Sequence, residues 1–431
     1  MDKKYIILIG ALILVVIFGV LLFASNRGKN KTTELNWITY DEEEKNFADI
    51  IPAFEAANKV KVNFKKIDPN NYEVESLNLI STGKIDVWGI PNTWLPKHHD
   101  KLAASPTKDI ASIYKKAYPE AISTENIIDG KVYGFPLSAD SLVMFSNYNA
   151  KSKAITGREF TQEQDDFIAK VPANWDDLAE LAKLITLKSN DKISVSVAGL
   201  GTDTVPSASD ILTLMMLQNG TQMTSDDHLQ ATFHTAINKF GGESFPGAKA
   251  LETYTGFANK NSSDYTFNSS LGDPLRAFAE NKLIYYIDYL SKESDIKRIS
   301  PELSYSIHPV PQVKETKNPV SFISYETFTV PQTSKNQLMA WKLVDFITSK
   351  ENAQSYYRVS KKQPALLNTD ADQSNETKIA LATAGTWYNP DAQEVNKIFK
   401  EMINQVLAGA SVQTALDSAS IKVTELLGKI Q

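Results

Sequence analysis

The sequence predicts an α/β protein with at least two domains, preceded by a single N-terminal transmembrane helix. Three observations lead to this fold class. At 431 residues, the chain is too long for one compact core. Segments with strand-like and helix-like patterns alternate along the chain, as they do in α/β layers. Near the N-terminus, an apolar run has the length of a membrane span.

The apolar run extends from Tyr5 to Ala24 and contains only apolar residues and glycine over 20 positions. A helix needs about 20 such residues to cross the bilayer core, whereas the apolar core of a cleavable signal peptide usually has about 7–15. The best cleavage site, after Ala24, has Leu22 where a small residue is required. We therefore interpret the run as an uncleaved anchor, with a cleaved signal peptide as the alternative. A lipoprotein is excluded because the chain has no cysteine.

Flanking charges give little help with the orientation of this anchor. Lys3 and Lys4 precede the run, and Arg27, Lys29 and Lys31 follow it. The basic stretch 26–33 reads as a linker, so residues 1–33 are expected to form the anchor and linker region.

The first elements after the linker alternate between strands and helices. The stretch Leu35–Thr39 is rich in strand-forming residues, and Val60–Phe64 alternates as a half-buried strand should. Between them, Asn46–Asn58 has apolar residues at helical spacing. A second helix at Glu75–Ser81 leads into a strand at Ile85–Trp88.

The stretch from Ile128 to Asn149 combines a turn with two strands. Asp129-Gly130 favours a tight hairpin turn, because glycine tolerates the positive φ that such a turn requires. Pro136 in the following strand confines that strand to a sheet edge or ends it. We expect the polar groups of Ser138, Asp140 and Ser141 to remain unpaired there, at a rim that binds something small and polar. The second strand is expected at Leu142–Phe145.

Helices dominate the later part of the chain. Asn174 is a helix cap before NWDDLAELAKLITLKS, whose leucine stripe repeats at helical spacing. A further helix is expected at Gln337–Ser349, and a strong amphipathic stripe runs from Val395 to Val406. Ser411 is the expected cap of the last helix.

Composition and motifs argue against several classes of function. The formal charge of −6 does not favour a nucleic-acid partner. No nucleophile elbow or phosphate-binding loop is present, and the five histidines lack metal-ligand spacing. We therefore predict no catalytic residues, no metal site and no cofactor. Paired carboxylates could form a glycosidase site on paper, but their separation decides that chemistry and the sequence does not give it.

Several segments resemble, in the same order, the family 1 solute-binding proteins of ABC importers, the maltose-binding-protein-like group. The segments are AFEAANKVKVNF (Ala53–Phe64), IDVWG (Ile85–Gly89), IDGKVYGFPLSAD (Ile128–Asp140), NWDDLAELAKLIT (Asn174–Thr186), AFAENKLIYYIDY (Ala277–Tyr289) and the stretch Phe328–Tyr357. Together they cover nearly the whole chain after the anchor. The chain departs from the family pattern at Asn281, where glycine is usual, and in the anchor, which replaces the usual signal or lipid attachment.

The resemblance implies a two-lobed, periplasmic-binding-protein-like fold of type II, in which crossover strands form a hinge. Carried over to this chain, lobe 1 comprises residues 34–146 and 283–332, and lobe 2 comprises residues 147–282 and 333–431. Ligand is expected between the lobes, at loops near strand ends, with the lobes closing around it.

The function implied by the resemblance is that of a membrane-tethered, extracytoplasmic substrate-binding protein, not an enzyme. It would bind a sugar or oligosaccharide reversibly and deliver it to the permease subunits of an ABC transporter. The soluble domain is expected outside the cell membrane and as a monomer. The alternative is a surface-anchored sensor or adhesin that uses the same clamp without transport, and a neighbouring permease pair or histidine kinase gene would distinguish the two.

Sugar recognition requires flat apolar faces for stacking on ring C–H groups, together with carboxylates and amides that match hydroxyl groups. On this basis and on the implied cleft, the candidate ligand-binding residues are Tyr40, Asp41, Trp88, Ser138, Asp140, Tyr286, Asp288, Tyr325, Glu326 and Trp387.

Alternatives stay open for several of these residues. Trp88 could equally pack beneath lobe 1, and Ser138 and Asp140 could belong to a solvated turn. Trp94, beside two prolines, is expected to pack in the core or rim. For Trp387, in the loop GTWYNP, ligand contact is favoured over packing.

Overall fold

The computed structural model describes residues 33–189, 192–239, 242–367, 369–371 and 373–430. The predicted anchor, Tyr5–Ala24, lies outside these residues. Within the described ranges, no helix is both long and apolar enough to cross a membrane.

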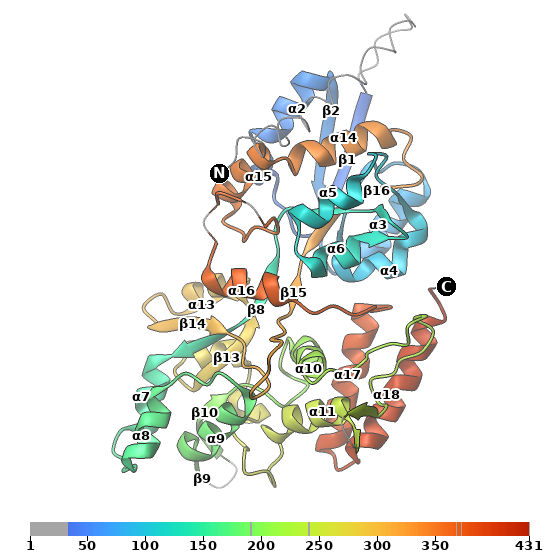
Figure 1. Cartoon of the computed structure of the whole chain (residues 1–431). Helices are drawn as coiled ribbons and strands as arrows, with labels where there is room; N and C mark the ends of the chain where they lie inside the picture. Colours follow the sequence, from blue (N-terminus) through green and yellow to red (C-terminus); the bar gives the residue numbers. More distant parts are fainter. Residues whose placement is uncertain (1–32, 190–191, 240–241, 368, 372, 431) are drawn as a thin grey trace, which may run out of the picture.

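The described chain forms two α/β lobes, each built on a six-stranded sheet (Figure 1). In lobe 1 the strand order is β2 (Val60–Lys66), β1 (Thr33–Thr39), β3 (Val87–Pro91), β16 (Glu326–Pro331) and β4 (Leu102–Ala103), with β7 (Phe135–Pro136) paired to β16. In lobe 2 it is β14 (Tyr305–Pro309), β8 (Asp140–Asn147), β13 (Leu283–Tyr289), β10 (Lys192–Ala198) and β9 (Leu187–Ser189), with β15 (Ile323–Ser324) paired to β8.

Helices cover both sheets. The helices of lobe 1 are α2 (Ile50–Asn58), α3 (Tyr72–Ser81), α4 (Leu95–His98), α5 (Ile110–Ala117), α6 (Glu120–Asn126), α14 (Gln337–Ile347) and α15 (Lys350–Ser360). Those of lobe 2 are α7 (Tyr148–Ile155), α8 (Gln162–Ala169), α9 (Trp175–Ile185), α10 (Ala208–Gln218), α11 (Pro246–Gly256), α12 (Pro274–Ala279), α13 (Glu293–Ile299), α17 (Ala392–Leu407) and α18 (Val412–Leu427). The helix α16 (Asn375–Thr383) lies at the junction of the lobes in Figure 1.

Lobe 1 begins with parallel strands joined by helices. β1 pairs in parallel with β2 and with β3, and α2 and α3 make the two crossover connections. Trp37 on β1 is fully buried and makes edge-on contacts with Phe47 at 4.7 Å and Phe328 at 5.2 Å between ring centroids. Helices α14 and α15 pack onto this same core through Trp341 and Tyr356.

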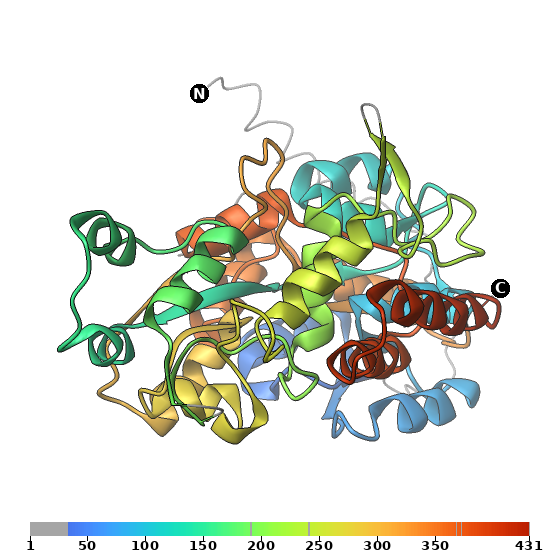
Figure 2. The ribbon, with the colours of Figure 1, turned by 90° about the horizontal axis from the view of Figure 1, so that it is seen from below.

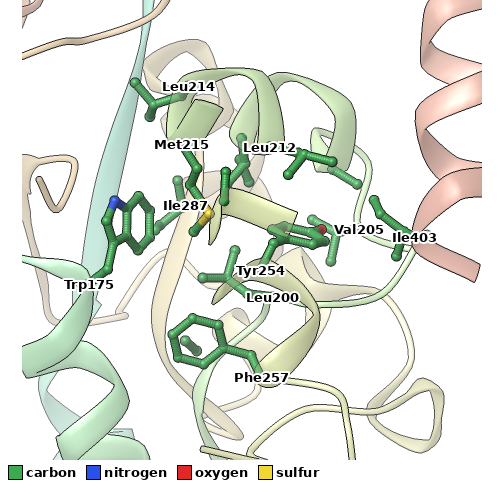
Figure 3. Packing of buried hydrophobic residues seen from close by; sticks show 14 of the residues in the cluster. Trp175, Leu200, Val205, Leu212, Leu214, Met215, Tyr254, Phe257, Ile287 and Ile403 are labelled. Atoms are coloured by element: carbon green, nitrogen blue, oxygen red, sulfur yellow. The ribbon is translucent and has the colours of Figure 1, made fainter. Parts of the chain in front are cut away.

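Lobe 2 has the larger core, formed mainly by α9, α10, α11, α17 and α18 against the sheet (Figure 3). Figures 1 and 2 show α17 and α18 side by side at one end of this lobe. Tyr254 and Phe257 lie near Leu200 and Leu212 in this core. Trp175 is buried at its edge, and its indole N–H donates to Gln218 Oε1 at 2.6 Å.

Several local expectations from the sequence are confirmed. Asp129 and Gly130 both have positive φ, 50° and 74°, in the two-residue turn between β5 (Ile127–Ile128) and β6 (Lys131–Val132). Pro136 lies on the short strand β7, whose one partner strand among the described residues is β16. Asn174 caps α9 by accepting from the backbone N–H of Asp177, and Ser411 caps α18.

The lobes are joined by crossing segments that lie close together. The chain leaves the sheet of lobe 1 after β7 and enters the sheet of lobe 2 with β8. It returns to lobe 1 between β15 and β16. A further crossing follows α15 and leads through α16 to α17. Ser138 and Pro364 form an isolated bridge between two of these crossings.

The predicted lobe boundaries require correction. The family resemblance placed residues 283–332 in lobe 1. In the structure, β13 and β14 both pair with β8 in the sheet of lobe 2, and only β16 of the described strands in this range belongs to the sheet of lobe 1. Residues 333–431 were assigned to lobe 2, yet α14 and α15 pack on lobe 1. The boundary at 146/147 falls at the end of β8 rather than before it. Apolar patterns indicate that a segment is buried, but they do not specify which sheet buries it.

Candidate ligand-binding cleft

A cavity of about 1370 Å³ lies between the lobes. On the side of lobe 1 it is lined by loops that follow β2 and β3 and by the end of α6. On the side of lobe 2 it is lined by α10, by Tyr289 at the end of β13, by the loop before α17 and by the first turns of α17. Loops at strand ends between two α/β units are the usual position of a ligand site.

Half-buried aromatic side chains line the cavity from both lobes. Trp94 belongs to lobe 1 and stacks on Tyr72, with ring centroids 5.8 Å apart and planes at 24°. Trp387 and Tyr388 belong to the loop before α17, and Tyr289 ends β13. These rings are therefore positioned by elements that are far apart in the sequence.

The loop that carries Trp387 is held close to lobe 2 by Gly385. A Cβ atom at this position would lie 2.8 Å from Val320 Cγ1 and 3.2 Å from Leu217 Cδ1. The backbone N–H of Gly385 donates to the carbonyl of Ser321 at 2.9 Å. The close approach thus depends on the absence of a side chain.

Glu125 in lobe 1 and Asp210 in lobe 2 are two carboxyl groups on the cavity wall that a tyrosine hydroxyl holds in place. In lobe 1, Glu125 Oε2 accepts from the hydroxyl of Tyr325 at 2.5 Å and from Asn92 Nδ2 at 3.0 Å. In lobe 2, Asp210 Oδ2 accepts from the hydroxyl of Tyr289 at 2.9 Å. Burial raises the pKa of Glu125, and it raises the pKa of Asp210 to about 6, with the Tyr289 hydrogen bond acting in the opposite direction.

An ion pair joins the lobes at the rim of the cavity. Lys97 Nζ lies 2.6 Å from Asp391 Oδ2 in lobe 2 and 2.6 Å from Glu73 Oε1 in lobe 1. His98 Nε2 is 2.9 Å from the same Glu73 oxygen, and the contacts with His98 and Lys97 lower the pKa of Glu73 to about 2. Asp391 also caps α17, because its Oδ1 accepts from the backbone N–H groups of Gln393 and Glu394.

Among the sequence-predicted ligand residues, Trp387 is one that lines the cavity. Trp88 does not, and the expectation that it stacks on ligand is corrected. It is fully buried in a core cluster beneath Trp94 and His98, with ring centroids 6.2 Å and 5.5 Å away. Trp94, which the sequence placed in packing, takes the position on the wall.

Tyr40, Asp41 and Glu326 lie together, but in a polar cluster of lobe 1 rather than on the cavity wall. Thr39 Oγ1 donates to Glu326 Oε1 at 2.6 Å, and the backbone N–H of Tyr40 reaches the same oxygen at 3.4 Å. Three carboxyl oxygens, including one from Glu42, lie close enough together to hold a metal ion. Lys362 already supplies the positive charge there, with Nζ bonded to Asp41 and 2.9 Å from Glu42 Oε1.

Ser138 and Asp140 lie on the crossing between lobes, and their polar groups are paired rather than left free as expected. Ser138 Oγ is 3.2 Å from the hydroxyl of Tyr356. Asp140 Oδ1 accepts from the backbone N–H groups of Ser141 at 2.9 Å and Ser291 at 3.2 Å. The chain that follows α15 completes this crossing through Pro364, a position that the sequence analysis did not assign to it.

Tyr286, Asp288 and Tyr325 lie behind the cavity wall. Tyr286 is buried and donates its hydroxyl proton to Asp288, which also accepts from Ser207 Oγ at 2.5 Å. Tyr325 is buried too, yet it reaches the cavity indirectly through its bond to Glu125. The β13 strand is covered on both faces, so alternation alone could not show which of its side chains face ligand.

Sequence reasoning missed Glu125, Asp210 and Asn92. Glu125 and Asp210 lie within helices α6 and α10, for which the sequence analysis made no prediction. Asn92 directly follows the observed strand β3 (Val87–Pro91), whereas the predicted strand ended earlier, at Trp88.

The comparisons with known proteins agree with this architecture. The chain matches the family described as bacterial extracellular solute-binding protein over residues 49–384. It is 25% identical over 314 residues to a protein of Brucella abortus (strain 2308) named as a binding protein, with 71% of this chain and 69% of the relative covered. It is 22% identical over 428 residues to the galactooligosaccharide-binding protein of Bacillus subtilis (strain 168), with 92% and 90% covered.

A solved structure shares the fold along nearly its whole length. The cyclic alpha-maltosyl-1,6-maltose binding protein from Arthrobacter globiformis superposes with a TM-score of 0.72 at 18% identity, over 93% of this chain and all of that one. The family match spans most of the described chain and includes both lobes. This chain therefore belongs to the bacterial extracellular solute-binding protein family, whose members bind solutes for ABC transporters rather than transform them.

Proposed function

We propose that this protein binds an oligosaccharide in the cavity between its lobes and delivers it to an ABC importer. The observation that carries the proposal is the presence of half-buried aromatic rings from both lobes on the wall of one large cavity. A drug-sized ligand needs about 300–1,000 Å³, so a cavity of about 1370 Å³ leaves room for several sugar rings. The relatives named for galactooligosaccharides and for a cyclic maltosyl-maltose support the same class of ligand.

Different residues of the cavity wall would contact the apolar faces and the hydroxyl groups of the sugar. The indole faces of Trp94 and Trp387 offer flat apolar surfaces to the C–H faces of sugar rings. Asn92, Glu125 and Asp210 offer an amide and carboxylates to hydroxyl groups. Because these groups come from both lobes, a ligand that contacts all of them favours the closed arrangement over an open one.

Titration calorimetry on the purified full-length protein with a panel of oligosaccharides tests this function. Trp94→Ala and Trp387→Ala should each weaken binding about 5–30-fold, which corresponds to about 1–2 kcal/mol of lost ring contact. Tyr148→Ala is the matched control, because Tyr148 is 50% exposed in lobe 2 and lies outside the cavity wall. Unchanged affinity in both tryptophan variants, or no binding of any oligosaccharide, would contradict the proposal.

Transport and sensing can be separated with the partner. Adding the ligand-loaded protein to its ABC permease and ATPase, once these are identified and reconstituted in vesicles, should raise ATP hydrolysis. If ligand binds but no transporter responds, a sensor or adhesin function replaces the importer function.

The proposed attachment to the membrane is tested separately. The run Tyr5–Ala24 supports an uncleaved anchor that leaves both lobes outside the cell membrane. Intact mass measurement should find residues 1–32 retained, and protein lacking them should leave the membrane fraction. Light scattering on that shorter protein should give the mass of a monomer.

A further inference from the structure

The carboxyl groups of Glu125 and Asp210 lie in similar settings on opposite sides of the cavity. Glu125 lies near the end of α6 in lobe 1, and Asp210 lies in the first turn of α10 in lobe 2. Both are partly buried. One oxygen of each is fixed by a tyrosine hydroxyl, from Tyr325 and Tyr289 respectively.

The second oxygen of each carboxyl is available to a ligand. Among the described residues, no hydrogen-bond donor contacts Glu125 Oε1 or Asp210 Oδ1. Neither oxygen is among the buried side-chain atoms that lack a hydrogen-bond partner, so each is open to the cavity, where a donor on the ligand takes the place of water. Each lobe therefore presents one carboxylate oxygen to the cavity as a hydrogen-bond acceptor in a fixed orientation.

Charges on the cavity wall are strongly unequal. The acidic wall residues are Glu73, Glu125, Asp129 and Asp210, whereas the basic ones are Lys397 and His228. Two of these charges already have partners: Glu73 is paired with Lys97 at 2.6 Å, and Lys397 is paired with Glu394 at 2.7 Å. Among the described residues, no arginine lines the cavity, although arginine is the residue best suited to hold a carboxylate.

We propose that the cavity selects its oligosaccharide by charge, accepting neutral or amine-bearing sugars and rejecting acidic ones through Glu125 and Asp210. A sugar hydroxyl or ammonium group donates to the available oxygens, whereas a sugar carboxylate would face two like charges in a partly dehydrated site. This inference rests on the proposed function, because it names the class of oligosaccharide that the same cavity takes.

The test compares saccharides of equal length that carry different charges. Titration calorimetry would use linear trimers in matched sets: galactotriose with trigalacturonate, and tri-N-acetylglucosamine with triglucosamine. If galactotriose or either glucosamine trimer binds, trigalacturonate should bind at least about tenfold more weakly than the best of them. The Glu125→Gln/Asp210→Asn double variant should narrow that ratio at least about fivefold, since both amides still accept from the tyrosine hydroxyls.

Each outcome has a distinct meaning. If trigalacturonate binds within threefold of the best uncharged or cationic trimer, the charge selection is refuted while oligosaccharide binding stands. If the double variant leaves the ratio unchanged, Glu125 and Asp210 are not its source, and the inference is likewise refuted. If no trimer of any charge binds, the proposed function itself fails.

Controls remove charge elsewhere without touching the cavity. Glu43→Gln in lobe 1 and Asp166→Asn in lobe 2 each delete one exposed carboxylate outside the wall. They should leave the ratio of affinities unchanged, which shows that the effect is local rather than a result of net charge. Thermal unfolding of the double variant checks that both lobes remain folded.

Discussion

Breaking the ion pair between Lys97 and Asp391 should shift the protein toward an open arrangement of its lobes. The pair spans the rim of the cavity at 2.6 Å, with side chains only 21% and 15% exposed. Asp391→Asn is the sharpest change, because asparagine retains the capping of α17 while removing the charge.

The size of the effect follows from the burial of the pair and from its neighbours. Exposed ion pairs contribute about 0.2–1 kcal/mol, and breaking a buried one costs about 3–5 kcal/mol. Lys97 keeps Glu73 as a partner after the change. The free energy lost from the closed arrangement should therefore lie well below the cost of breaking a buried pair, at about 1 kcal/mol. That corresponds to about a fivefold shift in the closing equilibrium and, through linkage, to ligand affinity weakened by up to the same factor.

Distances between labels on the two lobes measure the shift directly. The chain has no cysteine, so cysteines introduced at Lys108 in lobe 1 and Ile421 in lobe 2 would be the sole labelling sites. Without ligand, Asp391→Asn should populate longer distances, and calorimetry should report the loss in affinity. Glu43→Gln, which breaks the exposed Lys66 pair within lobe 1, should do neither.

The outcome that would refute this reasoning is specific. If Asp391→Asn changes neither the distance distribution nor the affinity while thermal unfolding is unaltered, the ion pair does not contribute to closure. Asp391→Ala would then serve as a further check, since it also removes the cap of α17 and should lower stability by about 1 kcal/mol.

Three further predictions concern single positions. Asn174→Ala removes the cap of α9 and should lower the free energy of unfolding by about 1 kcal/mol in denaturant titration, whereas Asn174→Asp should restore most of it. Gly385→Ala should displace the loop of Trp387 and weaken ligand binding several-fold with little change in melting temperature; equal affinity would show that the close approach is not needed. The pKa of Asp210 is raised to about 6 in the folded state, against about 3.9 in the unfolded state, so the folded state binds more protons between these pH values. The contribution of Asp210 to the free energy of unfolding should therefore grow as the pH falls from 7 to 5. Denaturant titrations at pH 7 and pH 5 should show a gain in the free energy of unfolding of the wild type that is smaller by about 1 kcal/mol in Asp210→Asn; an identical pH dependence would contradict the raised pKa.

Local structure was accessible from the sequence because it depends on neighbours along the chain. The turn at Asp129-Gly130 follows from the φ values that glycine and its neighbour tolerate, and the cap at Asn174 follows from a side chain that reaches its own helix. The alternation of Val60–Phe64 and the stripe of α9 follow from the repeat of strand and helix.

The assignment of strands to lobes was not accessible in this way. The strands β13 and β16 are both buried throughout their length, apart from Tyr289 at one end of β13. A sheet covered on both faces leaves no polar alternation to mark its partner. The hydrogen bonds of β13 with β8, more than a hundred residues earlier, placed it in lobe 2.

Composition and periodicity in the sequence indicated an α/β protein of at least two domains without catalytic motifs, and the ordered family resemblance implied two lobes that bind a solute. Tertiary structure alone decided which side chains meet at the cavity. Trp88 and Trp94 lie six residues apart, yet one is fully buried and the other lines the wall, because the strand β3 ends between them. Glu125 and Asp210 become opposing groups only when the lobes approach each other, and no local pattern records an approach between segments so far apart in the chain.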